Sequence, residues 1–395
     1  MPNGPHLSAL QAHDHPTVWM HGVGAHATCV IGVGQYARFE AHGEDRFGEL
    51  YRQFAKLAAT LPVRAAGIRA FVTTTFAPTS PRSSVLIVPQ VQWQFTPGNT
   101  RCIDLRSEPT IHGAPPRFGR RVVRAADTLL ARDAYERAVA KAVEKIRAGE
   151  LEKTVLARSH TLHLDGPVPI GALSEQLHRA YPSCWTFYVD GMIGASPEML
   201  VSVRNGAVHS RALAGSAPVS GDSHVDNAAA AALLASDKDR SEHAYAADSV
   251  RTVLEKIADV TIAPTRVVEL PTIMHLATDI TGQLRRDISA LEIAGMLHPS
   301  AAICGTPTEG AAAVLTDLEG ADRGRYSAPV GWVDDSGNGE FVIALRCAEV
   351  AATSLTMYAG AGIVAQSDPA TEYLETETKM LPIRRAVAAL DKDRQ

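Results

Sequence analysis

Two short segments each carry a pair of carboxylates at a spacing that a helix places on one face. Asp239 and Glu242 are three residues apart in SDKDRSEHAY, and Glu372 and Glu375 repeat that spacing in ATEYLETETK. Residues three apart on a helix are surface neighbours. Two helices that each offer a carboxylate pair would supply the hard oxygen ligands that Mg²⁺ prefers, with water and substrate completing its coordination. Solvated helix faces with local ion pairs explain the same spacing, so the pattern leaves both interpretations open.

Lys153 and Glu198 form a second set with the chemistry of a reaction centre. Lys153 opens the run KTVLARSHTLHL, and Glu198 lies in a Ser-Pro-Glu turn between two β-prone stretches. A lysine and a glutamate act as general base and general acid when burial and neighbouring charges move their pKa values towards neutrality. Solvated side chains at a strand end and in a turn fit the same sequence, so this assignment depends on the structure.

Two glycine patterns resemble a dinucleotide-binding loop without its context. Residues 32–37 and 360–365 match the loose form of that motif, GxGxxA. The motif requires a helix that opens at the loop and an acidic residue about 20 positions later. The first match has Arg52 near the acidic position, and the helix after the second starts only at Pro369. We expect neither to bind a nucleotide, because glycines within strands more often mark a close approach of the backbone, sometimes to a ligand.

The sequence predicts antiparallel strands interrupted by helices as the elements that position these residues. Strands are expected over 153–164, on both sides of the Ser-Pro-Glu turn and around a hairpin turn at Asn205-Gly206. Several strands followed by a helix, repeated, are typical of an α+β fold. Residues 97–121, rich in Pro, Gly and Arg, are expected to form a surface connection. Helices are expected over 44–61, 133–148, 170–180, 227–258 and 291–297, and from the N-cap pair Asp368-Pro369 onwards.

The composition excludes several classes of protein. Apolar residues are 46% and charged residues 21% of the 395 residues, which is typical of a globular chain. A net charge of -5 provides no general basic surface for a nucleic-acid backbone or an anionic membrane. The sequence contains no credible membrane span, and its 5 widely spaced cysteines do not predict a disulfide framework. We expect a cytoplasmic protein that binds neither nucleic acid nor membrane.

Taken together, these segments resemble the chorismate-utilising enzymes, a family that contains isochorismate, salicylate, anthranilate and aminodeoxychorismate synthases. Nine motifs match in order and spacing, and the N-terminal half resembles the family more weakly. The matching motifs are EKTVLARS (152–159), GASPEML (194–200), ALAGSAP (212–218), ASDKDRSEH (235–243), MHLATDITG (274–282), LHPSAAICGTP (297–307), DRGRYSAPVGW (322–332), GNGEFVIALRCAEV (337–350) and GAGIVAQSDPATEYLETETK (360–379).

The resemblance implies a single large α+β domain of two antiparallel sheets stacked face to face, flanked by helices, with a Mg²⁺-dependent site between the sheets. We expect residues 1–15 to be a disordered tail and 16–395 to be a single chorismate-binding domain. Within it, 16–125 would be a divergent N-terminal part and 126–391 the motif-bearing catalytic part.

The resemblance also implies roles for individual residues. Glu242 and Glu375 would be Mg²⁺ ligands, and Asp239 and Glu372 would be second carboxylates that hold metal-bound water. Asp239 stands where many relatives have Glu, which shortens the reach of the side chain and keeps its charge. The positions that would bind the substrate, chorismate, are Gly215, Ser216, His275, Thr278, Ala302, Ile303, Tyr326, Arg346, Gly362 and Lys379.

A lysine at the position of Lys153 distinguishes family members by the nucleophile that they use. The family adds a nucleophile to C2 of chorismate while the C4 hydroxyl departs, and members that use water resemble one another in having this lysine. Water needs a base to become a competent nucleophile, whereas ammonia does not. The resemblance therefore implies that Lys153 activates water and Glu198 protonates the leaving hydroxyl. No glutaminase subunit is expected, and the family suggests a monomer.

Ala302 beside Ile303 resembles the isochorismate synthases. Salicylate synthases, which go on to eliminate pyruvate, typically have a threonine in this segment. The expected function is a reversible, Mg²⁺-dependent conversion of chorismate to isochorismate, which feeds siderophore (2,3-dihydroxybenzoate or salicylate) or menaquinone synthesis. Salicylate synthase is the alternative. A catalytically silent relative should have lost some of the reacting residues, and this chain keeps them.

Overall fold

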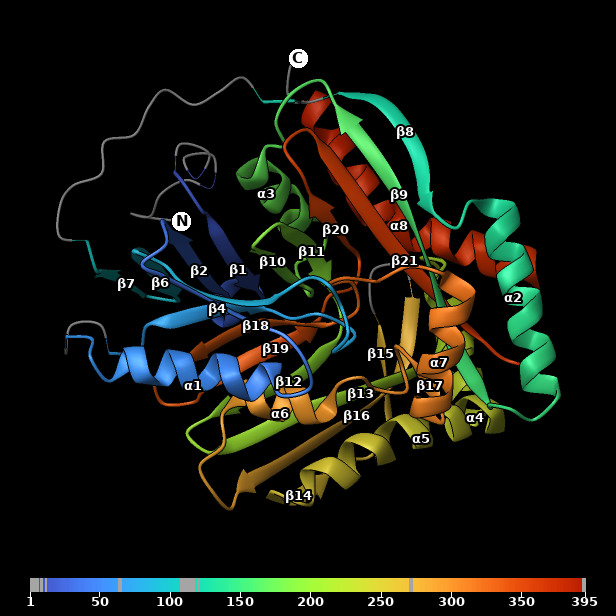
Figure 1. Ribbon diagram of the computed structural model, residues 1–395. Helices are drawn as coiled ribbons and strands as arrows, with labels where there is room; N and C mark the ends of the chain where they lie inside the picture. Colours follow the sequence, from blue (N-terminus) through green and yellow to red (C-terminus); the bar gives the residue numbers. More distant parts are fainter. Residues whose placement is uncertain are drawn as a thin grey trace.

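Two antiparallel sheets lie face to face, with helices on their outer sides, in the computed structural model of the chain (Figure 1). The structure describes residues 7, 10, 13–62, 66–106, 118, 119, 121–269 and 273–392. The expected α+β fold of two stacked antiparallel sheets flanked by helices is confirmed. None of the helices among these residues has the length and apolar character that crossing a membrane requires.

The first sheet carries the strand that begins at Lys153. Its 11 strands, counted over the described residues, follow the order β17-β9-β21-β20-β11-β10-β1-β2-β6-β7, with β8 paired to β9. These strands are β1 (Thr17–His21), β2 (Thr28–Val33), β6 (Val91–Thr96), β7 (Asn99–Asp104), β8 (Val122–Leu129), β9 (Lys153–Leu164), β10 (Trp185–Val189), β11 (Met192–Ser196), β17 (Gly305–Thr306), β20 (Cys347–Val350) and β21 (Ser354–Ile363).

The second sheet has 10 strands within the described ranges, in the order β14-β16-β13-β12-β19-β18-β4-β5-β3, with β15 paired to β16. These strands are β3 (Ala37–Ala41), β4 (Arg69–Thr73), β5 (Ser84–Val88), β12 (Met199–Arg204), β13 (Ala207–Pro218), β14 (Ala258–Ile262), β15 (Arg266–Glu269), β16 (Ile273–Leu284), β18 (Pro329–Asp334) and β19 (Gly339–Ile343). The chain passes from the first sheet to the second between β11 and β12, and it returns between β19 and β20.

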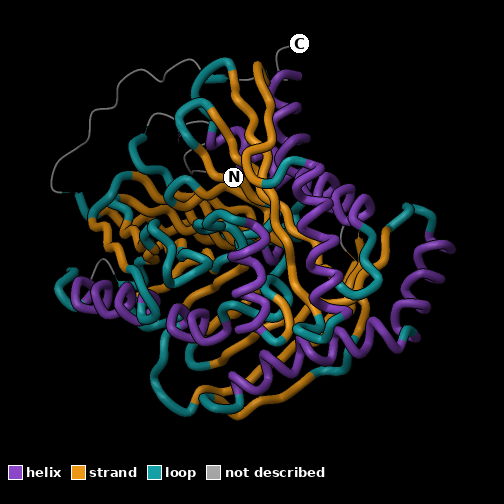
Figure 2. Tube along the Cα trace, turned by 45° about the vertical axis from the view of Figure 1, so that its right-hand side comes forward, coloured by secondary structure: helices purple, strands orange, loops and turns teal. Residues whose placement is uncertain are grey.

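The helices divide between the two outer faces, as Figure 2 shows in purple around the orange strands. Helices α3 and α8 contact the first sheet, helices α1, α4, α5 and α6 contact the second, and α2 and α7 contact β9. The helices are α1 (Arg46–Ala58), α2 (Arg132–Arg147), α3 (Ile170–Ala180), α4 (Ser223–Ala235), α5 (Asp237–Leu254), α6 (Ala290–Leu297), α7 (Thr308–Glu319) and α8 (Pro369–Lys392), with a short 3₁₀ turn at Gly24–His26.

A core of large apolar side chains joins the inner faces of the sheets. Trp19 and Phe187 come from the first sheet, Phe71 and Trp332 come from the second, and all four are buried in one cluster. Interdigitation of two inner faces is how stacked sheets remove their apolar sides from water. The outer face of the first sheet has its own cluster, in which β9 and β21 pack against α3 and α8.

The structure corrects several expectations from the sequence. The helix expected over 227–258 is two helices, α4 and α5, because Ser236 leaves the helical conformation and caps α5 by accepting a hydrogen bond from the Asp239 N–H. The surface connection expected over 97–121 contains strand β7. Helix α7 was not expected, although its alanine-rich run ends at Gly320 in the left-handed conformation, a common C-terminal signal.

Two described positions also differ from the disordered tail expected for residues 1–15. Leu7 and Leu10 are buried against Val18, Met20 and their neighbours. Apolar side chains removed from water in this way stabilise the fold. The domain divisions expected at residues 16, 125 and 391 stay predictions.

Candidate active site

Lys153 begins β9 at the edge of the first sheet, where it pairs with Thr306 of β17. Its side chain lies against Gly362 of the neighbouring strand β21. A Cβ atom built on Gly362 would lie 3.1 Å from Cε of Lys153 and 3.6 Å from Nζ. Such a contact is tighter than most side chains tolerate, so the glycine leaves room for the lysine chain.

Glu198 lies where the chain crosses from the first sheet to the second. The Ser196 hydroxyl donates a 2.6 Å hydrogen bond to the Ile343 carbonyl and accepts one of 3.2 Å from the Glu198 N–H. The Ile343 N–H in turn donates to the Glu198 carbonyl at 3.1 Å. These bonds fix the Ser-Pro-Glu turn to the end of β19, so the sequence pattern has a structural cause.

Arg346 lies at the second crossing between the sheets, between β19 and β20. It adopts φ 48°, an uncommon left-handed conformation for a residue with a side chain. The Arg346 carbonyl accepts a 3.3 Å hydrogen bond from the Ala195 N–H of β11. Because Ile343 bonds to the Glu198 turn and Arg346 bonds to β11, the two crossings are held together as one unit.

The charges around Glu198 show that four of the predicted residues meet. Burial raises the pKa of the Glu198 carboxyl to about 7, and the positive charges of Arg346, Lys153 and Lys379 oppose this rise. A carboxyl that holds its proton near neutral pH is suited to act as a general acid. A carboxyl with a raised pKa, an amine and two further cations therefore share one site.

Helix α8 brings Lys379 and two of the predicted carboxylates to this site. The helix begins where predicted, and the Asp368 carboxylate caps it by accepting from the N–H and hydroxyl of Thr371. Lys379 Nζ donates to the Gly360 carbonyl at 2.9 Å and to Glu375 Oε1 at 2.5 Å. Burial lowers the pKa of Lys379, the carboxylate of Glu375 opposes that effect, and the charge of Arg346 adds to it.

Glu372 precedes Glu375 by one turn and interacts with it electrostatically. Burial raises the pKa of Glu372, a hydrogen bond from Ser367 opposes the rise, and the negative charge of Glu375 adds to it. The charge of Glu375 beside the partly buried Glu372 carboxylate is an excess of negative charge, which a bound cation would relieve.

A β-bulge on the second sheet brings helix α5 to the same site. The pairing of β13 with β16 shifts register between Ala214 and Ser216, and Gly215 adopts φ 65°. A glycine in the left-handed conformation is typical of such bulges. A Cβ atom on Gly215 would lie 3.1 Å from Cβ of Asp239 and 3.3 Å from its Oδ1. The first turn of α5 therefore rests against the bulge.

His275 pairs with Ser216 at the bulge and lies within the electrostatic reach of Lys379 and Glu375 on α8. Its Nδ1 donates a 3.1 Å hydrogen bond to the Gly215 carbonyl. Burial lowers the pKa of His275 to about 4, and the charges of Arg346 and Lys379 act in the same direction while Glu375 opposes them. The ring is therefore neutral at pH 7, and with the proton on Nδ1 its Nε2 is an acceptor.

Thr278 lies on the same strand but is bonded to other parts of the protein. Its side chain is 3% exposed, and its hydroxyl bonds to His243 Nε2 at 2.7 Å and to the Thr265 hydroxyl at 2.9 Å. His243 belongs to α5, so Thr278 fastens that helix to β16. The expected position of Thr278 beside the substrate ring stays a prediction.

Ala302, Ile303 and Tyr326 come from two loops next to β9. The Ile303 carbonyl accepts a 3.0 Å hydrogen bond from Arg323, whose guanidinium also donates to the Val155 carbonyl of β9. Tyr326 is buried and stacks on Tyr358 with ring centroids 5.2 Å apart. Its hydroxyl oxygen lies 3.2 Å from the position of a Cβ atom on Gly360, and burial raises the pKa of the phenol.

The predicted metal ligands are described in part. Glu242 lies in α5, but its side chain is outside the part of the chain that the structure describes. The described side chains contain no group of three or more His, Cys, Asp or Glu residues that could hold a metal ion. The donors that are described, Asp239, Glu372 and Glu375, have the oxygen chemistry that Mg²⁺ prefers. The raised pKa of Glu372 fits a site that a cation would stabilise.

Sequence reasoning missed Ser196 and Arg158. Ser196 is fully buried and holds the turn of Glu198, and its signal was a serine directly before a proline at a strand end. Arg158 is fully buried in β9, and its signal was an arginine in the middle of a predicted strand. A buried charge requires partners, which the sequence does not locate.

A separate cavity of about 1040 Å³ opens between α1, α6 and α7. Its lining includes Arg46, Phe47, Phe76 and Leu315. None of the predicted site residues that the structure describes lines it, so it is distinct from the site around Glu198.

Comparison with known proteins finds similar chains over most of the sequence. A family model described as chorismate binding enzyme matches residues 109–388. The isochorismate synthase DhbC of Bacillus subtilis (strain 168) is 40% identical over 269 residues, which are 64% of this chain and 67% of that protein. The isochorismate synthase EntC of Escherichia coli (strain K12) is 36% identical over 253 residues, which are 62% of this chain and 65% of that protein. The structure of MenF, the menaquinone-specific isochorismate synthase from Escherichia coli, has a TM-score of 0.82 at 22% identity and covers 98% of this chain and 92% of its own, a likeness of fold.

Proposed function

This chain belongs to the family of chorismate-binding enzymes, and from that premise we propose that it is an isochorismate synthase. The observation that carries the proposal is the meeting of Glu198 with Lys153, Arg346 and Lys379, whose charges all act on its carboxyl. This set provides an acid, a base and cations for a dianionic substrate in one place.

Lys153 is the proposed base for the attacking water. As the water oxygen bonds to C2 of chorismate, the amine of Lys153 takes one of its protons, and the ring double bonds shift towards C4. The position of Lys153 against Gly362 supports this role, because the glycine leaves the space in which the end of the lysine side chain lies. A fixed base contributes more to the rate than a mobile one.

Glu198 is the proposed acid for the leaving hydroxyl. As the C–O bond at C4 breaks, the protonated carboxyl of Glu198 transfers its proton, and the hydroxyl departs as water. One water enters and one leaves, so the product is an isomer of the substrate. Proton exchange with solvent then returns Lys153 and Glu198 to their starting states, and the reverse reaction uses the same residues with exchanged roles.

Arg346 and Lys379 are the proposed partners of the substrate carboxylates. An ammonium group has three N–H donors, and the bonds to Gly360 and Glu375 use two of those of Lys379. Backbone N–H groups of Gly215, Ser216 and Gly362 are proposed to assist them. The remaining positions proposed to line the substrate are His275, Thr278, Ala302, Ile303 and Tyr326.

Mg²⁺ is the proposed cofactor, held by Glu242 and Glu375 with Asp239 and Glu372 binding its water, and it would supply a clamp for the ring carboxylate. The negative charge of Glu375, which adds to the raised pKa of Glu372, supports a cation at this end of α8. Ala302 and Ile303, in a segment where salicylate synthases typically have a threonine, favour release of isochorismate over elimination of pyruvate.

Product analysis tests the proposal directly. Purified protein is incubated with chorismate, without ammonia, in the presence of Mg²⁺ or of EDTA, and the products are separated by chromatography. We expect a mixture of chorismate and isochorismate that forms only with Mg²⁺, and a loss of about 10²- to 10⁴-fold in rate for Lys153→Ala.

Two other outcomes would change the assignment. Salicylate together with pyruvate would identify the alternative, a salicylate synthase. Unchanged chorismate under both conditions would contradict the activity and leave the fold and family as they are.

A further inference from the structure

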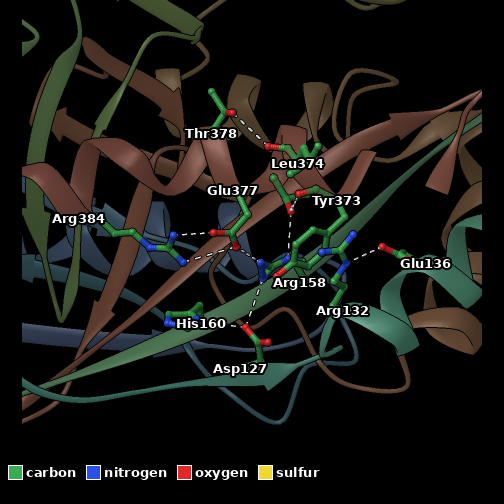
Figure 3. Close-up of polar contacts among 11 residues, drawn as sticks. Asp127, Arg132, Glu136, Arg158, His160, Tyr373, Leu374, Glu377, Thr378 and Arg384 are labelled. Atoms are coloured by element: carbon green, nitrogen blue, oxygen red, sulfur yellow. Dashed lines mark hydrogen bonds and ion pairs between the residues drawn. The ribbon is translucent and has the colours of Figure 1, made fainter. Parts of the chain in front are cut away.

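Arg158 lies at the centre of a polar network that joins β8, β9 and α8 (Figure 3). Its side chain is 0% exposed. Its Nη1 lies 3.4 Å from Asp127 of β8, its Nη2 donates to Glu377, and its Nε donates to the Thr376 hydroxyl at 3.0 Å. A buried guanidinium with two carboxylates and a hydroxyl around it is fixed in place, because its planar fork matches several acceptors at once.

The contacts of Arg158 fall on the turn of α8 that carries the proposed metal ligands. Its guanidinium also lies over the ring of Tyr373, 4.3 Å from the centroid. Tyr373 directly follows Glu372, and Thr376 directly follows Glu375. Arg158 therefore contacts α8 at Tyr373 and Thr376, each of which is one position away from one of these two carboxylates.

Apolar packing does not hold this part of the helix as it holds the rest. The C-terminal part of α8 buries Met380, Ile383 and Val387 against the first sheet. Between Pro369 and Lys379, Thr376 is the one residue described as buried. The place of the first turns thus depends on the ring of Tyr373, which packs against Tyr135 and the core, and on polar contacts, of which those of Arg158 are the most enclosed.

Arg158 and Lys153 lie five positions apart in β9 and therefore point to opposite faces of the strand. Lys153 faces Gly362 and the site between the sheets, whereas Arg158 faces α8. One strand thus supports both the proposed base and the helix of the proposed metal ligands.

We propose that Arg158 is a positioning residue that sets the place of Glu372 and Glu375 and thereby the affinity of the site for Mg²⁺. This inference rests on the proposed function for the identity of the metal. Arg158 touches neither the substrate nor the metal; it acts through Tyr373, Thr376 and Glu377.

Arg158→Lys tests the inference, because lysine keeps the buried charge and cannot bind three acceptors and stack on Tyr373 together. Thr376→Val is a second, milder variant that removes one of the three bonds of Arg158, together with the bond from the Thr376 hydroxyl to the Tyr373 carbonyl, without changing any charge. Arg384→Lys is the matched control. Arg384 binds the same carboxylate, Glu377, at 2.6 Å but does not contact the turn of Glu372 and Glu375.

The readout is binding of Mn²⁺, a spectroscopic substitute for Mg²⁺, followed by electron paramagnetic resonance of the free ion. Circular dichroism and thermal unfolding of each variant establish that it is folded. We expect Arg158→Lys to weaken Mn²⁺ binding by about 10- to 100-fold, as is typical for residues that orient metal ligands. Thr376→Val should weaken it less, and Arg384→Lys should bind as the wild type does. In assays, the Mg²⁺ concentration at half-maximal rate should rise in parallel.

The inference is overturned if Mn²⁺ binds folded Arg158→Lys and Thr376→Val as tightly as it binds the wild type. It is also overturned if Arg384→Lys weakens binding equally, since the effect would then be a general loosening of α8, or if the wild type binds no Mn²⁺. Failure of the proposed function looks different, because the wild type would bind Mn²⁺ in an Arg158-dependent manner and would leave chorismate unchanged.

Discussion

Lys153 and Gly362 lie against each other on neighbouring strands, and a Cβ atom on the glycine would come within 3.1 Å of Cε of the lysine. The strands are β9 and β21, which pair over most of their length, so neither backbone can shift to make room. The direction of the Lys153 amine is therefore set in part by the absence of a side chain at position 362.

Gly362→Ala is expected to lower kcat with little change in stability. The added methyl group displaces the end of the Lys153 side chain by roughly a few tenths of an ångström, and misplacing a reacting group lowers the rate, by up to about 100-fold at about 1 Å. Alanine is favoured over glycine within a strand by roughly 0.5–1 kcal/mol, which offsets the strain of the contact. Steady-state kinetics and thermal unfolding measure the two effects separately.

Gly310→Ala is the control for this substitution. Gly310 lies in α7, and a Cβ atom there meets nothing closer than Pro307 at 3.8 Å. We expect its activity to equal that of the wild type. Equal activity of Gly362→Ala and the wild type would contradict the proposed constraint on Lys153.

Glu198→Gln is expected to remove activity, because an amide cannot give a proton to the leaving hydroxyl. In the wild type, the rate of the forward reaction should fall as pH rises above about 7, where the carboxyl loses its proton. The pH profile of kcat/KM with chorismate measures this limb. A forward rate that stays constant well above pH 7 would contradict the role of Glu198 as an acid.

The same substitution is expected to stabilise the protein at high pH. The pKa of Glu198 is about 7 in the folded chain against an ordinary value of 4.5, so the unfolded state ionises first as pH rises. The free energy of unfolding is therefore highest below about pH 4.5, where Glu198 is protonated in both states. It falls as pH rises through about 7, by up to about 3 kcal/mol. Glutamine does not titrate. Denaturant unfolding should therefore find Glu198→Gln more stable than the wild type at pH 8 and similar to it at pH 4; an equal difference at both values would argue against a buried, titrating Glu198.

Glu372→Gln is expected to raise the melting temperature of the metal-free protein and to weaken its response to Mg²⁺. Burial and the charge of Glu375 raise the pKa of Glu372, so its ionised form destabilises the fold above that pKa unless a cation is bound. Thermal unfolding in EDTA and in Mg²⁺ measures both effects.

Glu136→Gln, at an exposed pair with Arg132 on α2, is the control and should respond to Mg²⁺ like the wild type. A wild type with the same melting temperature in EDTA and Mg²⁺ would contradict the metal assignment.

Local signals in the sequence predicted the elements that carry the site. The run from Lys153 to Leu164, predicted as a strand, is β9 without a change of bounds, and Asp368-Pro369 begins α8 through a side-chain cap. The Asn205-Gly206 turn joins β12 and β13 with positive φ at both residues, as a two-residue hairpin requires. Each of these signals is complete within a few residues of chain.

Features that depend on distant contacts could not be predicted from the sequence. The break between α4 and α5 at Ser236 interrupts a run of good helix formers, and only the cap bond to Asp239 distinguishes it. Arg158 finds Glu377 on a helix more than 200 positions later. The meeting of Glu198 with Arg346 depends on two crossings between sheets, whose closeness follows from the order of strands and not from either motif.

Ser196 and Ser210 each donate a hydrogen bond from a buried hydroxyl to a backbone carbonyl, Ser196 next to Glu198 and Ser210 within the second sheet. The Ser196 hydroxyl donates to the Ile343 carbonyl at 2.6 Å, and the Ser210 hydroxyl donates to the Leu200 carbonyl at 2.6 Å. Both side chains are buried, with exposed fractions of 0% and 1%. Ser196 alone also accepts from the Glu198 N–H, so it is the one that orients the proposed acid.

Ser196→Ala and Ser210→Ala are therefore expected to cost similar stability and different activity. Each leaves a buried carbonyl without its hydroxyl partner, which destabilises the fold by about 1–3 kcal/mol. Loss of the Ser196 bonds also frees the turn of Glu198 from Ile343 at the end of β19. Arg346 follows Ile343 by three residues, so the position of Glu198 relative to Arg346 should change as well. We expect kcat to fall about 10-fold or more for Ser196→Ala and to stay near the wild-type value for Ser210→Ala, because misplacing a reacting group raises the barrier of the chemical step. Denaturant unfolding and steady-state kinetics on both variants measure the two effects. An equal loss of kcat in both variants would mean that activity follows global stability. The hydrogen bonds between the two sheet crossings would then have no part in placing Glu198.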